Sequence, residues 1–115
     1  MKETVTIKNN YEFRRMYSKG KSAVTPGVVV YFRPNRFGHN RIGVTVSTKV
    51  GKAVVRNLVR RRLREIFRLN QEKMLQGYDV IVIARVRTPE IPYRMLNGMF
   101  LRACVQLGLL KEEKA

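Results

Sequence analysis

The sequence predicts an α/β (α+β) fold, a two-layer sandwich of about four mixed strands and three helices. Three observations lead to this prediction. Residues 41–50 alternate large apolar side chains with small or polar ones, which is the period of a half-buried strand. Residues 53–75 carry apolar side chains at helical spacing. Residues 78–86 form a nearly continuous apolar run, as in an interior strand of a sheet.

Capping and turn residues set the boundaries in the first half of the chain. Asn9, followed three residues later by Glu12, resembles a helix start, and Gly20 resembles a stop. Pro26 and Gly27 open the strand that follows. The expected elements are a helix over 10–19, a strand over 28–33, a loop over 35–40 and a strand over 41–50, with room for an extra strand near 21–25.

The second half of the chain alternates helix and strand. Gln76 and Gly77 end the central helix, and the last helix follows Pro89 and Pro92. The expected elements are a helix over 53–75, a strand over 78–86 and a last helix with Leu96, Met99, Phe100, Ala103 and Leu107 on one face. The predicted order is helix, strand, strand, helix, strand, helix, with the extra strand before the first of these strands. Residues 1–115 should form one domain with frayed ends at 1–6 and 111–115, since 44% hydrophobic content suits a single core.

The segment from Arg56 to Arg68 holds six arginines and one acid, Glu65. At about 100° per residue, one arc of the helix is apolar and the adjoining arc is cationic. The apolar arc holds Val55, Val59, Leu63, Ile66 and Phe67, and the cationic arc holds Arg56, Asn57, Arg60, Arg61, Arg64 and Arg68. Solvated helices usually mix charges of both signs one turn apart. This face is therefore predicted to bind a polyanion, with an ordinary solvated face as the alternative.

The charge of the whole chain also indicates an anionic partner. It has 24 Lys and Arg against 8 Asp and Glu, a formal net charge of +16 and a pI near 11.0. Nucleic acid is the expected partner, and anions such as sulfate or phosphate should bind and stabilise the basic surface. No apolar run approaches the roughly 18 residues of a membrane span, and the amino terminus lacks the apolar core of a signal peptide. A cytoplasmic protein is expected, with its one cysteine, Cys104, as a buried thiol.

The chain offers no nuclease machinery of its own. Metal-dependent hydrolysis needs clustered carboxylates or histidines. Glu112 and Glu113 are in the tail, Glu65 is flanked by arginines, and His39 is alone in a loop. We therefore expect neither catalytic residues nor a metal site in this protein.

Three aromatic residues suggest a second binding feature. Phe13 and Tyr17 are one helical turn apart and share a face. Tyr31 lies on the opposite side of its strand from Val30 and Phe32, which predicts that it points away from the core. Such rings could line a groove in which unpaired bases stack. Ordinary core packing of Phe13 and Tyr17 is the alternative.

From about Ile7 to Leu109 the chain resembles the protein subunit of bacterial ribonuclease P. The motifs that carry the resemblance are Gly43-Val-Thr-Val-Ser47, Lys49-Val-Gly51 and Ala53-Val-Val-Arg-Asn57 followed by Arg60-Arg61 and Arg64-Glu65. Supporting fragments are Glu12-Phe13, Tyr17, Gly20, Tyr31 and Ile83-Ala-Arg85. Each fragment is weak alone, but their order and spacing together are specific.

The resemblance implies a left-handed crossover between parallel strands and a role in removing the 5′ leader of precursor tRNA. In this family a large RNA, using Mg²⁺, is the catalyst of the endoribonuclease, and the basic protein is its partner. The resemblance implies that Arg56, Asn57, Arg60, Arg61 and Arg64 contact that RNA, and the predicted surface also includes Lys49, Lys52, Arg62 and Arg68. It also implies that Phe13, Tyr17 and Tyr31 line a cleft for the single-stranded leader. A non-catalytic ribosomal or RNA-chaperone protein is the rival interpretation.

Three positions depart from the family pattern. Leu58 stands where a basic residue is usual, Arg62 where an apolar one is usual, and Thr48 where lysine is common. Positions 58 and 62 are one helical turn apart. We expect the charge to have moved one turn along the same face, which re-aims one phosphate contact.

Overall fold

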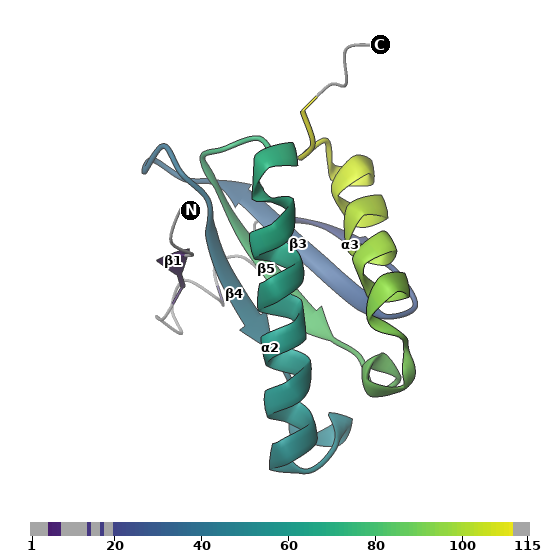
Figure 1. Cartoon of the computed structure of the whole chain (residues 1–115). Helices are drawn as coiled ribbons and strands as arrows, with labels where there is room; N and C mark the ends of the chain where they lie inside the picture. Colours follow the sequence, from purple (N-terminus) through teal and green to yellow (C-terminus); the bar gives the residue numbers. More distant parts are fainter. Residues whose placement is uncertain (1–4, 8–13, 15–16, 18–19, 112–115) are drawn as a thin grey trace.

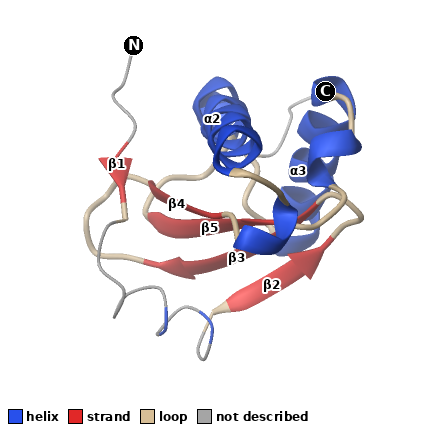
Figure 2. Ribbon diagram, turned by 90° about the horizontal axis from the view of Figure 1, so that it is seen from below, coloured by secondary structure: helices blue, strands red, loops and turns tan. Residues whose placement is uncertain are grey.

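A computed structural model describes residues 5–7, 14, 17 and 20–111 of this chain. These residues form one five-stranded mixed sheet with two helices against one of its faces (Figures 1 and 2). The strands are β1 (Val5–Thr6), β2 (Lys21–Val24), β3 (Val28–Pro34), β4 (Arg41–Thr45) and β5 (Tyr78–Ala84). The helices are α2 (Ala53–Asn70) and α3 (Tyr93–Leu107), and 3-10 turns lie at Thr48–Val50, Gln71–Lys73 and Thr88–Glu90. The two-layer α+β architecture is as predicted.

The order of the strands across the sheet is β1-β4-β5-β3-β2. Strand β3 runs antiparallel to β2 and β5, whereas β4 runs parallel to β1 and β5. In Figure 1, β4 and β5 both run downward, α2 returns upward in front of them, and β5 lies to the right of β4. This is a left-handed crossover, the uncommon hand for parallel strands joined through a helix. It agrees with what the family resemblance implies.

The core lies between the sheet and the two helices. Alternation along β3 turns Val28, Val30 and Phe32 toward the helices, where all three are buried. From α2 the buried residues are Val59, Leu63, Ile66, Phe67 and Asn70, so the predicted apolar arc faces the core. From α3 they are Leu96, Phe100, Ala103 and Cys104. Burial raises the pKa of the Cys104 thiol to about 12, which keeps it protonated and unreactive.

The central helix is shorter than predicted. It ends at Asn70 rather than at residue 75, and the 3-10 turn Gln71–Lys73 follows it. The Asn70 side chain donates a hydrogen bond to Asn97 of α3 at 2.7 Å. Farther on, the Leu75 N–H donates to the Leu109 carbonyl at 2.6 Å. These contacts with the last part of the chain draw the backbone out of the helix.

Both long strand predictions run past the observed strand ends. Strand β4 stops at Thr45 rather than at residue 50, because the chain turns into the 3-10 turn Thr48–Val50. Strand β5 stops at Ala84 rather than at residue 86, where the Thr88 hydroxyl accepts a hydrogen bond from the Arg85 N–H at 2.7 Å. The extra strand near 21–25 is present as β2.

The amino-terminal segment differs from the prediction in one respect. Val5 and Thr6, expected to be frayed, form β1 and pair in parallel with β4. Of the helix predicted over 10–19, the structure describes Arg14 and Tyr17, and both are helical. The rest of that segment, including Phe13, lies outside the described residues. The predicted count of three helices and the full element order therefore stay predictions.

Candidate nucleic-acid interface

The sheet face turned away from α2 and α3 carries two of the predicted groove aromatics. Tyr31 lies on the opposite side of β3 from Val30 and Phe32, as the alternation predicts. Its ring centroid lies 5.2 Å from that of Tyr17, at an interplanar angle of 69°. The Tyr17 hydroxyl also forms a hydrogen bond with the Thr45 hydroxyl on β4, at 3.3 Å. The structure thus brings residues 17, 31 and 45 together on one surface.

An apolar floor lies beside these rings. Ile7 and Ile81 are buried on this face, and Tyr31 and Ile83 pack against them. Tyr17 itself is 42% exposed, so its ring is not part of the core. An exposed ring, Tyr17, beside a half-buried one, Tyr31, over an apolar floor forms a surface on which unpaired bases can stack. Phe13 lies outside the described residues, and its place in this groove stays a prediction.

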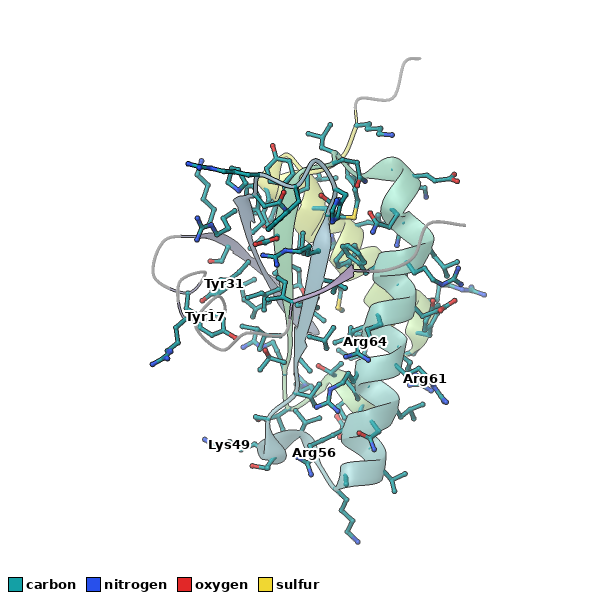
Figure 3. The ribbon with its side chains drawn as sticks, turned by 90° about the vertical axis from the view of Figure 1, so that its left-hand side faces the viewer. Tyr17, Tyr31, Lys49, Arg56, Arg61 and Arg64 are labelled. Carbon is teal, nitrogen blue, oxygen red and sulfur yellow. The ribbon has the colours of Figure 1, made fainter. Side chains whose placement is uncertain are left out.

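Helix α2 presents its cationic arc away from the core. Asn57, Arg61 and Arg64 are exposed, whereas Arg56 and Arg60 are half-buried. The Arg60 guanidinium donates a hydrogen bond to the Asn57 side chain at 3.1 Å, which orients both groups. Figure 3 shows Arg56, Arg61 and Arg64 along α2, with Tyr17 and Tyr31 on the far side of the sheet from this helix. The basic and aromatic surfaces therefore lie on opposite layers.

One arginine of the arc is neutralised within the helix. Arg68 forms an ion pair with Glu65, and its Nε atom donates to Glu65 Oε2 at 3.2 Å. The hydrogen bond from Arg68 and its positive charge hold the pKa of Glu65 below its usual range. Because Glu65 is the only acid of the helix, the uncompensated charge gathers toward the amino-terminal half of α2.

The segment before α2 adds two exposed lysines, Lys49 and Lys52. Gly51 between them has φ 154, a backbone conformation that favours glycine. Figure 3 shows Lys49 and Arg56 at the same end of the molecule. The Arg56 Nε atom is buried and has no hydrogen-bond acceptor among the described residues.

Leu58 and Arg62, the two positions of α2 at which the charge departs from the family pattern, lie beside the basic residues of this helix. Leu58 and Arg62 are both half-buried. Arg62 forms no ion pair with any other described residue, which leaves its charge available to an external anion. The predicted shift of charge by one turn is thus compatible with the position of Arg62.

Sequence reasoning missed a polar and aromatic pocket at the other end of the sheet. The pocket has a volume of about 530 Å³ and is lined by Arg33, Pro34, Asn35, Arg36, Phe37, Arg41 and Asp79. Its signal was available, because Arg33 shares the outward face of β3 with Tyr31, and one aromatic residue interrupts the polar loop over 35–40. The pairing of Arg41 with Asp79, across strands 38 residues apart, was not readable from local pattern.

The described residues contain no group of three or more His, Cys, Asp or Glu side chains that could hold a metal ion. The two acids with lowered pKa values, Asp79 and Glu65, each bond to an arginine. No helix among the described residues is long and apolar enough to cross a membrane.

Comparisons with known proteins show the family to which the chain belongs. A family model described as Ribonuclease P matches residues 1–108. A "Ribonuclease P protein component" from Natranaerobius thermophilus is 42% identical over 112 residues, which is 97% of each chain. The solved structure of the RNase P protein of Staphylococcus aureus superposes with a TM-score of 0.83 at 32% identity, covering 95% of this chain and 100% of that one. The RNase P protein from Thermotoga maritima superposes with a TM-score of 0.78 at 31% identity, covering 88% of this chain and 94% of that one.

Proposed function

We propose a role for each of the two surfaces, from the premise that this chain belongs to the bacterial ribonuclease P protein family. Membership makes the chain a protein subunit in tRNA 5′ processing, within a ribonucleoprotein that acts as an endoribonuclease. It also implies an RNA partner. The ribosomal or RNA-chaperone alternative loses its basis, because the family match extends over residues 1–108.

The basic surface is the proposed contact with the catalytic RNA. It comprises Lys49, Lys52, Arg56, Asn57, Arg60, Arg61, Arg62, Arg64 and Arg68. Each cation that replaces a condensed counterion on the RNA adds to affinity and to its salt dependence. Arg68 should add least, because Glu65 already neutralises it. The strongest contacts are expected from the amino-terminal half of α2.

The aromatic face is the proposed groove for the single-stranded 5′ leader of precursor tRNA. The observation that carries this proposal is the position of Tyr17 and Tyr31, whose rings meet on the sheet face away from the basic helix. The protein can then hold two RNA segments at once, one on each layer. Binding the leader in a fixed position would align the scissile phosphate in the catalytic RNA. The proposed location is the bacterial cytoplasm, where precursor tRNA is made.

The Mg²⁺ ions of the reaction are assigned to the RNA in this proposal. Hydrated Mg²⁺ is usually held by one or two free carboxylates together with phosphates. Among the described acids, the carboxylate of Asp79 is occupied by Arg41 and Asn35 and that of Glu65 by Arg68, and none belongs to a group of three or more side chains that could hold a metal ion. When bound, the ions supply the activated water and stabilise the leaving oxygen. The protein contributes charge screening and position.

A pair of variants separates the two roles. Arg60→Ala combined with Arg64→Ala should weaken binding of the catalytic RNA when the holoenzyme is reconstituted. The slope of log K against log[salt] should become shallower by roughly 0.9 for each phosphate contact that is lost. Tyr31→Ala should leave that affinity unchanged. The matched control is Arg94→Ala with Arg102→Ala, which removes two exposed arginines of α3, outside both surfaces. If the control pair weakened binding as much as the α2 pair, net charge alone would explain the effect and the α2 surface would be refuted.

A further inference from the structure

The pocket around Phe37 has no role in the function proposed above, yet it opens on the same sheet face as Tyr31. We propose that it binds a nucleotide of the 5′ leader farther from the cleavage site than those at Tyr17 and Tyr31, with the base stacked on Phe37 and the adjacent phosphates held by Arg33 and Arg36. This inference rests on the leader groove proposed above.

Strand register places the pocket on the surface of the groove. In the register of the sheet, Arg33 of β3 lies directly opposite Asp79 of β5, and Asp79 lies directly opposite Arg41 of β4. This row lies two residues along from the row of Tyr31, Ile81 and Gly43, and side chains two residues apart share a face. The rise along β3 puts Arg33 roughly 7 Å from Tyr31. An extended RNA strand stacked on Tyr31 therefore reaches the pocket without crossing the sheet.

Phe37 is presented as a stacking platform. Its side chain is 56% exposed, which is unusual for a phenylalanine in a loop that could fold it away. The Arg41 guanidinium carbon lies 4.5 Å from the ring centroid and covers one face of the ring. The His39 ring is a second neighbour, with its centroid 6.0 Å from that of Phe37 at an interplanar angle of 38°. A base that stacks on the exposed part of the Phe37 ring would extend this group, in the sequence-tolerant mode in which single strands bind.

The loop that carries Phe37 is held at both ends. Asn35 Oδ1 accepts a hydrogen bond from the Phe37 N–H at 2.9 Å, and Asn35 Nδ2 donates to the His39 carbonyl at 3.0 Å. At the other end, the Asn40 side chain donates to the Leu75 carbonyl at 2.8 Å. The exposed ring is thus fixed in place before any ligand arrives, which lowers the entropic cost of binding.

The charges of the pocket fit a phosphate strand. The Asp79 carboxylate is saturated by Arg41, at 2.8 and 2.7 Å, and by Asn35, at 2.9 Å. Arg33 and Arg36 form no ion pair with any other described residue. Arg33 and Arg36 therefore add positive charge beside one exposed ring, whereas the single acid of the pocket is already paired with Arg41.

The position of the pocket indicates which part of the leader it receives. Lys49 and the amino-terminal half of α2, the proposed contact with the catalytic RNA, follow the carboxyl end of β4. The pocket lies at the opposite end, where Arg41 begins β4 and Asp79 is near the start of β5. In this proposal the cleavage site lies toward the Lys49 end, beside the catalytic RNA, so that the leader passes Tyr31 first and reaches Phe37 later.

The test uses the reconstituted holoenzyme and precursor tRNAs whose leaders are shortened from the 5′ end, to about 10, 5 and 2 nucleotides, with mature tRNA as the leaderless reference. Phe37→Ala should weaken binding of the longest-leader substrate about tenfold and leave the shortest and mature tRNA unchanged. Arg36→Ala should make the slope of log K against log[salt] shallower by roughly 0.7, and only for the substrate with the longest leader. Phe37→Tyr, which keeps an aromatic ring, is the matched control and should bind like the parent. Tyr31→Ala, measured in parallel, should weaken binding at shorter leader lengths as well.

Two results would overturn the inference. Equal loss with all tRNAs, or weaker binding of the catalytic RNA, would show that Phe37 contacts the RNA subunit. Unchanged binding throughout would show that the ring only packs on Arg41. If Tyr31→Ala retains its leader-dependent loss in either case, the groove stands and only the Phe37 subsite is refuted. If Tyr31→Ala also shows no leader dependence, the groove itself fails.

Discussion

The Asp79 carboxylate joins three segments that are far apart in the sequence. It lies on β5, accepts hydrogen bonds from Arg41 on β4, and accepts another from Asn35 in the loop after β3. Burial acts to raise the pKa of Asp79, but the hydrogen bonds from Arg41 and Asn35 outweigh it, so the pKa is lowered. A carboxyl group with a lowered folded-state pKa stabilises the fold above its unfolded-state value of about 4, and that stability is lost as the pH falls through the folded-state value.

Asp79→Asn should therefore lower the free energy of unfolding by about 3 kcal/mol at neutral pH, since it removes the carboxylate that pairs with the largely buried Arg41 guanidinium. The difference from the parent should shrink as the pH falls through the lowered pKa of Asp79. Urea unfolding across the acid range measures both values. Glu72→Gln, which removes an exposed acid and the same charge, should change stability little. A pH-independent difference would mean that the Asp79 charge does not contribute.

The close packing around Gly27 predicts that a larger residue at this position destabilises the fold. A Cβ atom there would lie 2.8 Å from Met99 Sδ and 2.9 Å from both Ile91 Cδ1 and Leu96 Cδ2. Gly27→Ala should thus cost about 1–3 kcal/mol through overpacking of α3 against the start of β3. Gly98→Ala is the control, because nothing lies within 4 Å of its added Cβ. In the helix interior that change should stabilise by roughly 0.5–1 kcal/mol. Thermal unfolding of the two variants should therefore shift in opposite directions.

Helix α2 carries the basic surface, and the Leu58 and Arg62 exchange tests how that surface tolerates a moved charge. Leu58→Arg with Arg62→Leu restores the usual family pattern and should retain most holoenzyme activity. Arg62→Leu alone should lose affinity for the catalytic RNA, with a salt slope lower by roughly 0.9. Competition binding over a range of salt concentrations gives both quantities. A single variant with the affinity and salt slope of the parent would mean that Arg62 is merely solvated.

The faces of α2 could be predicted from the sequence, whereas its end could not. The spacing of Val59, Leu63 and Phe67 defines the buried side regardless of what packs against it. The end depends on Asn70 bonding to Asn97, a partner 27 residues away, which no local pattern shows. The same reason explains β1, whose two residues form a strand only because β4 lies beside them. Tyr31 was placed by alternation alone, but Phe37 became part of a site only through strand pairing.

The molecule as a whole carries more charge than its folding requires. The net charge is +16 on 115 residues, and repulsion between these cationic side chains destabilises the compact state. The arginines of α2 concentrate the charge on one surface. Sulfate should bind there and raise the melting temperature. At 100 times its dissociation constant, binding at one site adds about 2.7 kcal/mol to the free energy of unfolding. Sulfate also stabilises proteins by exclusion from their surfaces. The comparison is therefore with Arg60→Ala combined with Arg64→Ala, which should gain less; an equal gain would mean that no specific anion site exists on α2.

The groove for the leader is the central claim, and Tyr31 tests it most directly. In the holoenzyme, Tyr31→Ala should weaken binding of precursor tRNA with a leader of several nucleotides by about 1–3 kcal/mol, the worth of one stacked base. Tyr31→Phe should bind like the parent. The same measurement on Phe13→Ala and Tyr17→Ala extends the test to the other predicted groove residues.

The deciding measurement is the ratio of the affinities for precursor and mature tRNA, taken side by side for the parent and for Tyr31→Ala. We predict that the ratio falls about tenfold in the variant, with the affinity for mature tRNA unchanged. An unchanged ratio, with both RNAs bound equally well or equally badly, would contradict the assignment of the aromatic sheet face to the leader.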